Sequence, residues 1–270
     1  FIPFLYPQIG WGPTAVLIAV IALVTMFPIL RTARERYPAP KSNVTIRKLI
    51  STVAHNKYLL VYYLSIILAS FFNMSSIANY FYINALGGPE IIGVISIILL
   101  VPSALVTFLM PMMVKRFDKF NIIVFTTAAT IIFNIIAYFV GYSNFGAFIL
   151  VAILKTLFTS MGTLLEPMFT ADCTEYGLYK TGEHSEGVIF SIETFSNKLF
   201  IAISGSLSMF VLGIIGFAEG AGAVQSASTL DSMWFLMNIL PAIGAATSLI
   251  ILLFGYKLRD KDVQVMSKVN

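Results

Sequence analysis

The sequence is organised as long apolar stretches separated by short polar ones. A helix needs about 20 mostly apolar residues to cross the hydrocarbon core of a bilayer. Glycine, proline or charged residues interrupt the apolar runs at intervals that suit such helices. Seven stretches meet the requirement: about Pro13–Leu30, Tyr58–Ile83, Ile91–Val114, Asn121–Val140, Gly146–Ala171, Val188–Phe217 and Ser232–Tyr256. The pattern therefore predicts an all-α integral membrane protein with about seven spanning helices.

Composition supports this interpretation. A soluble domain carries roughly a quarter of its residues as charged side chains, whereas here the share is 11%, with 58% hydrophobic residues. A chain of this size cannot enclose so much apolar surface in one core, so lipid is the expected solvent. The single Cys173 excludes an internal disulfide. The chain opens on Phe1 without a signal peptide, and we expect it to begin in the middle of a longer protein.

Basic residues alternate along the chain. Fifteen of the 17 Lys and Arg residues follow the first, third and fifth predicted spans or lie in the C-terminal tail. The intervening segments hold none: 1–12, 84–90, 141–145 and 218–231. The positive-inside rule then places the start of the chain outside and its C-terminus in the cytoplasm, as in a multi-pass cell-membrane protein. The net charge of +4 is thus a topology signal, and no nucleic-acid partner is expected.

The longest basic segment, 31–57, separates one leading helix from a block of six. Within it, the apolar residues of Thr45–Lys57 recur at helical spacing while the charges lie elsewhere. This predicts an amphipathic helix, either on the inner membrane surface or packed as a plain linker against other loops.

Two basic residues, Lys155 and Lys198, remain inside predicted spans near the bilayer midplane. A charge there costs ~2.5 kcal/mol or more, so each should face a wet cavity or an ion-pair partner that fixes packing. Glu166 lies eleven residues after Lys155 on the same face, but ~16 Å along the axis, too far for a direct pair. We expect Glu166 in an inner gate or a helix-end contact.

A polar stripe surrounds the second lysine. Ser191, Thr194 and Lys198 follow i, i+3, i+7 spacing, with Glu193 and Asn197 beside them as an i, i+4 pair. The stripe predicts the wall of a hydrophilic cavity.

No metal site, cofactor or enzymatic activity is expected. No other metal-ligating residues stand at ligand spacing from His55 or His184 in the sequence. The sequence also contains no P-loop, G-x-S-x-G, H-E-x-x-H or cysteine cluster.

The stretch Asp172–Lys198, DCTEYGLYKTGEHSEGVIFSIETFSNK, resembles the segment joining the tenth and eleventh helices of the glycoside–pentoside–hexuronide:cation symporters, the melibiose permease family within the major facilitator superfamily. Twelve positions match in order: Asp172, Glu175, Tyr176, Gly177, Lys180, Thr181, Gly182, Glu186, Gly187, Phe190, Ser191 and Lys198. One departure is His184, where the family has Arg; ion pairing by His184 would be weaker and pH-dependent.

The resemblance extends along the chain. The segment 111–119, PMMVKRFDK, resembles the superfamily's short basic loop motif. The predicted spans then correspond to the sixth to twelfth of twelve helices. Residues 1–30 become an external loop and the last helix of the N-terminal half, 31–57 the central cytoplasmic loop, and 58–270 the C-terminal six-helix bundle with its tail.

The family implies secondary active transport: sugar uptake coupled to Na⁺ or H⁺ symport by alternating access. The implied partners are a sugar or glycoside, a monovalent cation, the bilayer and the missing N-terminal half. The cavity would be lined by Lys198, Thr194, Asn197, Ser191, Glu193 and Lys155, and a cytoplasmic gate would comprise Asp172, Glu175, Tyr176, Lys180, His184 and Glu186.

Three alternatives remain. A lipid-type carrier of the same superfamily would have a more apolar cavity. A seven-helix receptor or retinal protein fits the topology, but the last span lacks a lysine for a Schiff base. A membrane enzyme or scaffold is disfavoured because no nucleophile–base set is found.

Overall fold

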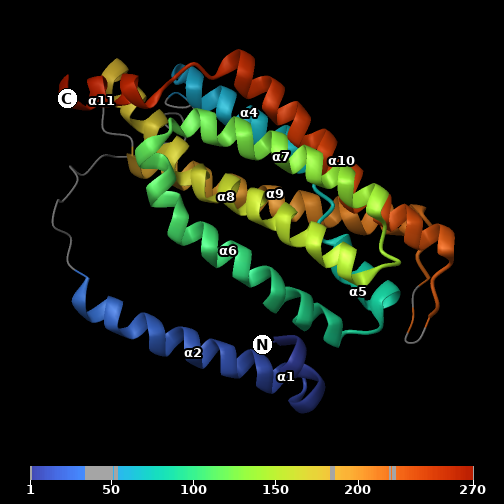
Figure 1. Cartoon of the computed structure of the whole chain (residues 1–270). Helices are drawn as coiled ribbons and strands as arrows, with labels where there is room; N and C mark the ends of the chain where they lie inside the picture. The colour runs from blue at the N-terminus through green and yellow to red at the C-terminus, as the bar shows by residue number, and fades with distance from the viewer. Residues whose placement is uncertain are drawn as a thin grey trace.

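The computed structural model describes residues 2–33, 51, 54–182, 186–218, 220 and 223–269, and their regular structure is entirely helical (Figure 1). The helices are α1 (Ile2–Ile9), α2 (Trp11–Thr32), α4 (Lys57–Phe71), α5 (Ile77–Leu86), α6 (Glu90–Arg116), α7 (Lys119–Val140), α8 (Phe145–Thr181), α9 (Glu186–Ile214), α10 (Ala227–Gly255) and α11 (Asp260–Val269). The predicted fold class is confirmed. Most of the segment 31–57, including the greater part of the predicted amphipathic helix, lies outside the described residues.

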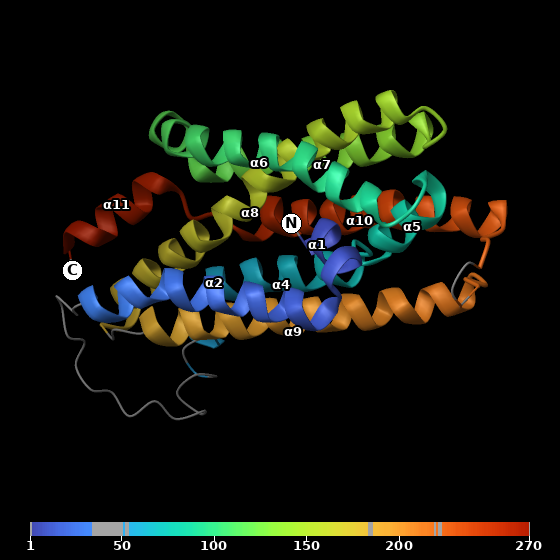
Figure 2. The same cartoon turned by 90° about the horizontal axis from the view of Figure 1, so that it is seen from below.

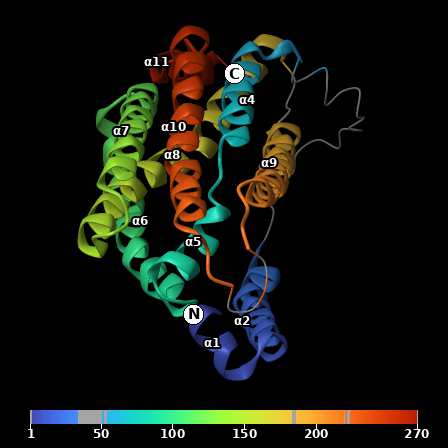
Figure 3. The same ribbon diagram turned by 90° about the vertical axis from the view of Figure 1, so that its right-hand side faces the viewer.

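Within the described ranges, six helices are long and apolar enough to cross a membrane: α2, α6, α7, α8, α9 and α10. The predicted second span, Tyr58–Ile83, is interrupted. It consists of α4, with 15 residues, and α5, with 10 residues, which follow one another along the bundle (Figure 3). Each is too short to cross alone, so this span is a discontinuous helix.

Polar groups at the interruption explain why the helix stops there. The side chain of Asn73 accepts a hydrogen bond from the backbone N–H of Ser75 at 3.0 Å. The hydroxyl of Ser204 on α9 donates a hydrogen bond to the Asn73 carbonyl, which therefore has a partner outside its own helix. Asn and Ser offer the backbone such local alternatives to helical hydrogen bonds. Met74 and Ile77 are buried, so the break is anchored in the protein interior.

The bundle packs around α8 and α10. α7 lies along both of them, α4 lies along α10, and α6 lies along α8 (Figures 1 and 2). α9 contacts α4 and α8 at one side. α2 stands apart from the other long helices in Figures 1 and 3, and Thr14 is its one buried residue among those described. The apolar surface of α2 is thus left for lipid or another helical unit to cover.

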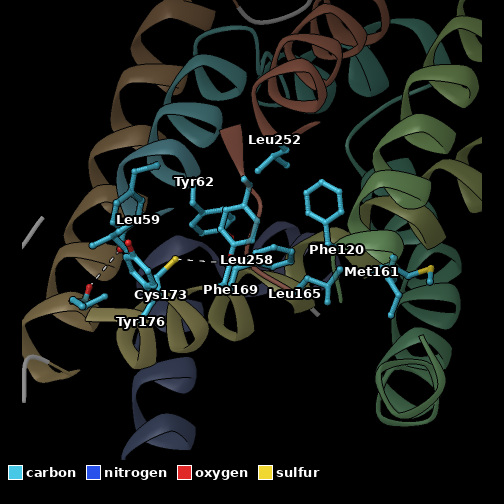
Figure 4. Packing of buried hydrophobic residues seen from close by; sticks show 14 of the residues in the cluster. Leu59, Tyr62, Phe120, Met161, Leu165, Phe169, Cys173, Tyr176, Leu252 and Leu258 are labelled. Carbon is cyan, nitrogen blue, oxygen red and sulfur yellow. Dashed lines mark hydrogen bonds between the residues drawn. The ribbon is translucent and has the colours of Figure 1, made fainter. Parts of the chain in front are cut away.

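All helix ends next to the predicted cytoplasmic segments lie at one end of the bundle, where α11 also lies (Figure 1). A buried core fills this end, with Tyr62 stacked on Phe169 at a centroid distance of 5.3 Å and Leu165 fully buried beside them (Figure 4). A second core, around Phe81 and Trp234, fills the opposite end. The middle of the bundle lies between these two cores.

α10 and α4 approach very closely. A Cβ atom on Gly244 would lie 2.8 Å from the carbonyl oxygen of Ala69, and one on Gly255 would lie 2.7 Å from Cγ1 of Val61. Small residues permit such close packing of membrane helices. The Gly244 contact lies just before the helix interruption.

Candidate functional site

A stripe of polar side chains runs along α8 through the middle of the bundle. Lys155, Thr159 and Thr163 are spaced four residues apart, and Glu166 follows within one more turn, so all four share a broad face. The Thr159 hydroxyl donates to the Lys155 carbonyl at 2.9 Å, and that of Thr163 to the Thr159 carbonyl at 3.2 Å. Their hydroxyl donors are satisfied within the helix, which leaves oxygen lone pairs available as acceptors.

One side of this stripe lines a cavity of about 290 Å³ between α4, α7, α8 and α10, here termed the α4–α8 cavity. Its polar lining is Tyr62, Ser65, Ser70, Asn73, Thr127, Thr130, Thr159, Thr163, Glu166 and Ser248. Asn73 belongs to the helix interruption, so the break in α4–α5 borders this cavity directly. Hydroxyl and amide groups line part of the cavity beside apolar side chains such as Ile66, Phe158 and Leu252, and such polar groups can bind uncharged polyols.

The other side of the stripe lines a cavity of about 390 Å³ between α6 and α8, the α6–α8 cavity. It is bordered by Ser103, Thr107, Lys155, Thr156, Thr159, Ser160, Thr163 and Leu164. The hydroxyls of Ser103 and Ser160 are 3.0 Å apart and join the two helices. Thr159 and Thr163 border both cavities, so one helix face connects them.

Lys155 has neutral partners. Its Nζ donates to Oδ1 of Asn238 at 3.2 Å and to the carbonyl of Met237 at 3.4 Å. It forms no ion pair with any residue in the described ranges. Lys155 also borders a smaller cavity of about 80 Å³ on the side of Trp234 and Asn238.

The predicted stripe on α9 occupies a different surface. Ser191, Thr194 and Lys198 are exposed, while Glu193 and Asn197 are half-buried. The hydroxyls of Ser191 and Thr194 donate to carbonyls of their own helix at 2.6 and 2.9 Å. None of the α9 side chains that the structure describes borders the α4–α8 or α6–α8 cavity. The structure therefore does not bring Lys155 and the α9 stripe into one cavity of this chain.

At the predicted cytoplasmic end, Asp172 forms an ion pair with Lys119, with Nζ and Oδ1 2.5 Å apart. Lys119 Nζ also lies 3.4 Å from Asp260 on α11. Asp118 accepts a hydrogen bond from the backbone N–H of Asp260, and Asp260 accepts one from the backbone N–H of Lys119, both at 3.0 Å. The start of α7, the lower part of α8 and the tail helix are thus tied together.

The remaining predicted gate residues follow Asp172 along α8. This helix continues to Thr181, beyond the predicted end at Ala171, so the matched segment up to Thr181 is helical rather than a loop. Tyr176 is buried and meets Tyr58 edge-on at 4.7 Å, Lys180 lies 5.9 Å above its ring, and Glu175 is half-buried. His184 and the side chain of Glu186 lie outside the described residues.

Sequence reasoning overlooked the hydroxyls that flank Lys155. The i, i+4, i+8 recurrence of Lys155, Thr159 and Thr163 was a usable signal on α8. The contribution of Ser103 and Thr107 could not be predicted from the sequence, because no local pattern indicates that α6 faces α8. Asp260 likewise lies 141 residues from its partner Lys119.

Comparison with known proteins identifies the family. The family model described as MFS/sugar transport protein matches residues 7–260. The chain is 30% identical over 261 residues to an uncharacterized symporter, YjmB, of Bacillus subtilis (strain 168), covering 95% of this chain and 56% of that protein. It is 26% identical to the isoprimeverose transporter of Lactiplantibacillus pentosus, covering 96% and 54%. It is 23% identical to a glucuronide carrier protein homolog of Escherichia coli (strain K12), covering 91% and 54%.

The chain thus spans about half the length of these relatives. The match to the family model covers most of the 270 residues and agrees with the helical membrane architecture described above. It also agrees with the resemblance of the segment Asp172–Lys198. The chain is therefore a multi-pass membrane protein that belongs to the sugar-transport family of the major facilitator superfamily, a family of transporters rather than of enzymes or receptors.

Proposed function

We propose that this chain is the C-terminal portion of a symporter that moves a sugar into the cell together with Na⁺ or H⁺ by alternating access. The observation that carries the proposal is the set of hydroxyl groups in the middle of the bundle, where α8 borders two cavities. Their volumes fall near the lower end of the ~300–1,000 Å³ usual for small-molecule sites, a size suited to a monosaccharide or small glycoside. Relatives named as an isoprimeverose transporter and a glucuronide carrier homolog support a sugar as substrate.

Hydroxyl and amide groups favour a sugar over a lipid. A sugar leaves water only if its hydroxyls regain hydrogen bonds in the protein, since unpaired polar groups are costly to bury. Asn73, Thr127, Thr130 and Ser248 can supply these bonds from three helices around α8. A lipid-carrying relative would not need this set of hydrogen-bonding groups.

The exposed stripe on α9 forms, in this proposal, the wall that faces the other half of the transporter. Relatives are nearly twice as long as this chain, which supports a second helical unit. Lys198 would orient a carboxylate supplied by that unit, and Thr194 and Asn197 would bind the sugar. The cation would favour sugar binding by reciprocal coupling, so its gradient drives uptake.

The cytoplasmic end would act as the gate. The ion pair of Lys119 with Asp172 ties α7 to α8, and Asp260 adds the tail helix. Rocking of one bundle against the other would require contacts at this end to form and break once per cycle. The interruption between α4 and α5 places non-helical backbone next to the α4–α8 cavity, where a membrane protein tolerates it.

Lys198→Ala, made in the protein encoded by the complete reading frame, tests the proposal. Reconstituted in liposomes with a Na⁺ or H⁺ gradient, this variant should lose sugar accumulation. The variant should still fold and insert in the membrane, because Lys198 is exposed on this chain and, in the proposal, borders a cavity rather than a packed core. Lys198→Arg should not restore uptake fully, since a planar fork does not reproduce a compact ammonium.

Lys257→Ala is the matched control, because Lys257 is an exposed lysine beyond the end of α10. It should leave uptake and stability unchanged. Normal gradient-driven uptake by Lys198→Ala would remove this residue from the site. Failure of the unmodified protein to accumulate any sugar with either gradient would contradict the proposed function.

A further inference from the structure

The interruption between α4 and α5 is held in place by α9, which contacts both of these short helices (Figure 2). Ser204 on α9 donates a hydrogen bond to the backbone carbonyl of Asn73. Ser208, one turn further along α9, donates to the sulfur of Met74 at 3.5 Å. Both serines are buried, so these two contacts between α9 and the interruption lie in the protein interior.

The Ser204 hydroxyl differs in its acceptor from other hydroxyls on α9. A serine or threonine within a helix commonly donates to a carbonyl of its own preceding turn. Ser191 and Thr194 do so, at 2.6 and 2.9 Å. Ser204 instead donates to a carbonyl 131 positions away in the sequence. The bond between the helices therefore takes the place of a local bond that this side chain could have formed.

The Asn73 carbonyl needs this donor because the helix stops. In an uninterrupted helix it would accept the backbone N–H of Ile77, four residues further on. That N–H donates to the carbonyl of Met74 instead, at 3.1 Å. A backbone carbonyl left unpaired in the interior is costly. Ser204 supplies the missing hydrogen bond and so fixes the position of the Asn73 peptide group.

The Asn73 side chain extends from the same peptide to the α4–α8 cavity, which it borders. Its Oδ1 accepts a hydrogen bond from the backbone N–H of Ser75 at 3.0 Å, which sets the orientation of the amide. None of the hydrogen bonds among the described residues uses its Nδ2, so two N–H groups remain for a ligand. A shift of the Asn73 peptide would therefore displace a donor at the cavity wall.

We propose that Ser204 is a positioning residue for sugar binding. It does not line the α4–α8 cavity itself. By holding the carbonyl of Asn73, it keeps the amide of that residue in the orientation that binds a sugar hydroxyl. Asn73 touches the sugar, and Ser204 acts through it from another helix. This inference rests on the proposed function, because it concerns how the same cavity binds its substrate.

The test is a double-mutant cycle on the purified protein encoded by the complete reading frame. Binding is measured for isoprimeverose, D-xylose, D-glucose and methyl β-D-glucuronide, and the sugar that binds most tightly is used for the cycle. Ser204→Ala should weaken its binding about 3- to 10-fold, the effect of one hydrogen bond, and Asn73→Ala by a similar factor. In the Asn73→Ala background, Ser204→Ala should change the binding constant by less than about 2-fold, because no amide remains to be oriented.

Ser208→Ala is the matched control. Ser208 is also buried and shares a face of α9 with Ser204, but its acceptor, Met74, does not line the α4–α8 cavity. This variant should bind the sugar as tightly as the parent, within about 2-fold. Ser204→Cys keeps nearly the same side-chain volume with only a weak S–H donor, and it replaces Ser204→Ala in the cycle if that variant does not fold.

Hydrogen–deuterium exchange of the backbone amides in 72–78 reports the same contact without a sugar. Ser204→Ala should speed exchange in this segment about 3- to 10-fold, because one hydrogen bond that holds it is gone. The amides of α7, which does not contain or contact this serine pair, should keep their exchange rates.

Additive effects of Ser204→Ala and Asn73→Ala would mean that Ser204 only stabilises the bundle, and they would overturn the inference while the proposed function stands. The same holds if Asn73→Ala binds the sugar as tightly as the parent, or if Ser208→Ala weakens binding as much as Ser204→Ala. Unchanged exchange of 72–78 in Ser204→Ala would also overturn it. If the unmodified protein neither binds nor accumulates any of the four sugars, the proposed function and this inference are both wrong.

Discussion

Replacing Gly244 with alanine should loosen the contact between α10 and α4. The new Cβ would lie 2.8 Å from the Ala69 carbonyl oxygen and 2.9 Å from Cβ of Phe72. Both atoms belong to or adjoin the backbone, so no flexible side chain can move aside. The helices would have to separate by roughly 0.6 Å to reach ordinary contact, and overpacking of this kind costs about 1–3 kcal/mol.

The higher helix propensity of alanine opposes this destabilisation. Alanine is favoured over glycine in a helix by about 0.5–1 kcal/mol. The net destabilisation of Gly244→Ala is therefore about 0–2.5 kcal/mol, or a Tm lowered by up to about 10 °C on the scaling for soluble proteins of this size. Gly213→Ala on α9 is the matched control, since a Cβ there meets nothing within 4 Å. It should be neutral or slightly stabilising.

The assay is thermal unfolding of the purified variants in the same detergent. A functional consequence is also expected, because Ala69 lies beside Gly244 and borders the α4–α8 cavity. Sugar uptake by Gly244→Ala should fall more than by Gly213→Ala. If Gly244→Ala is as stable as Gly213→Ala or more so, then α10 and α4 do not approach as described, and the reasoning is refuted.

Three further predictions follow from other parts of the molecule. In a cysteine-free parent made by Cys173→Ala, Ser267→Cys should react with a membrane-impermeant thiol reagent only from the cytoplasm and Ser228→Cys only from outside; the reverse would contradict the predicted topology. Lys119→Ala and Asp172→Ala should each destabilise the protein, and the double variant should show a coupling energy of about 1–3 kcal/mol in denaturation; additive effects would mean that the ion pair contributes nothing. The 270 residues reconstituted alone should not accumulate sugar in vesicles, because we expect half of the cavity wall to come from elsewhere; robust uptake would disprove the two-half proposal.

The sequence by itself determined the membrane class and most of the helices. Long apolar runs report helix positions because a bilayer demands about 20 apolar residues in a row, a requirement local to each segment. The family resemblance was also readable, since the segment Asp172–Lys198 is contiguous. The depth of Lys155 within its span followed from the helical rise alone. The packing of that lysine did not.

Tertiary structure decided the features that depend on neighbours. The predicted second span continued through 72–76 although Asn73, Ser75 and Ser76 are polar. The structure shows that the helix stops there, because Asn73 and Ser204 provide other hydrogen bonds. The pairing of Lys119 with Asp172 and Asp260 joins residues 53 and 141 positions apart. The hydroxyls around Lys155 meet only because α6 packs against α8. Each of these contacts links segments remote in sequence, so no local pattern specifies it and only the folded bundle brings the groups together.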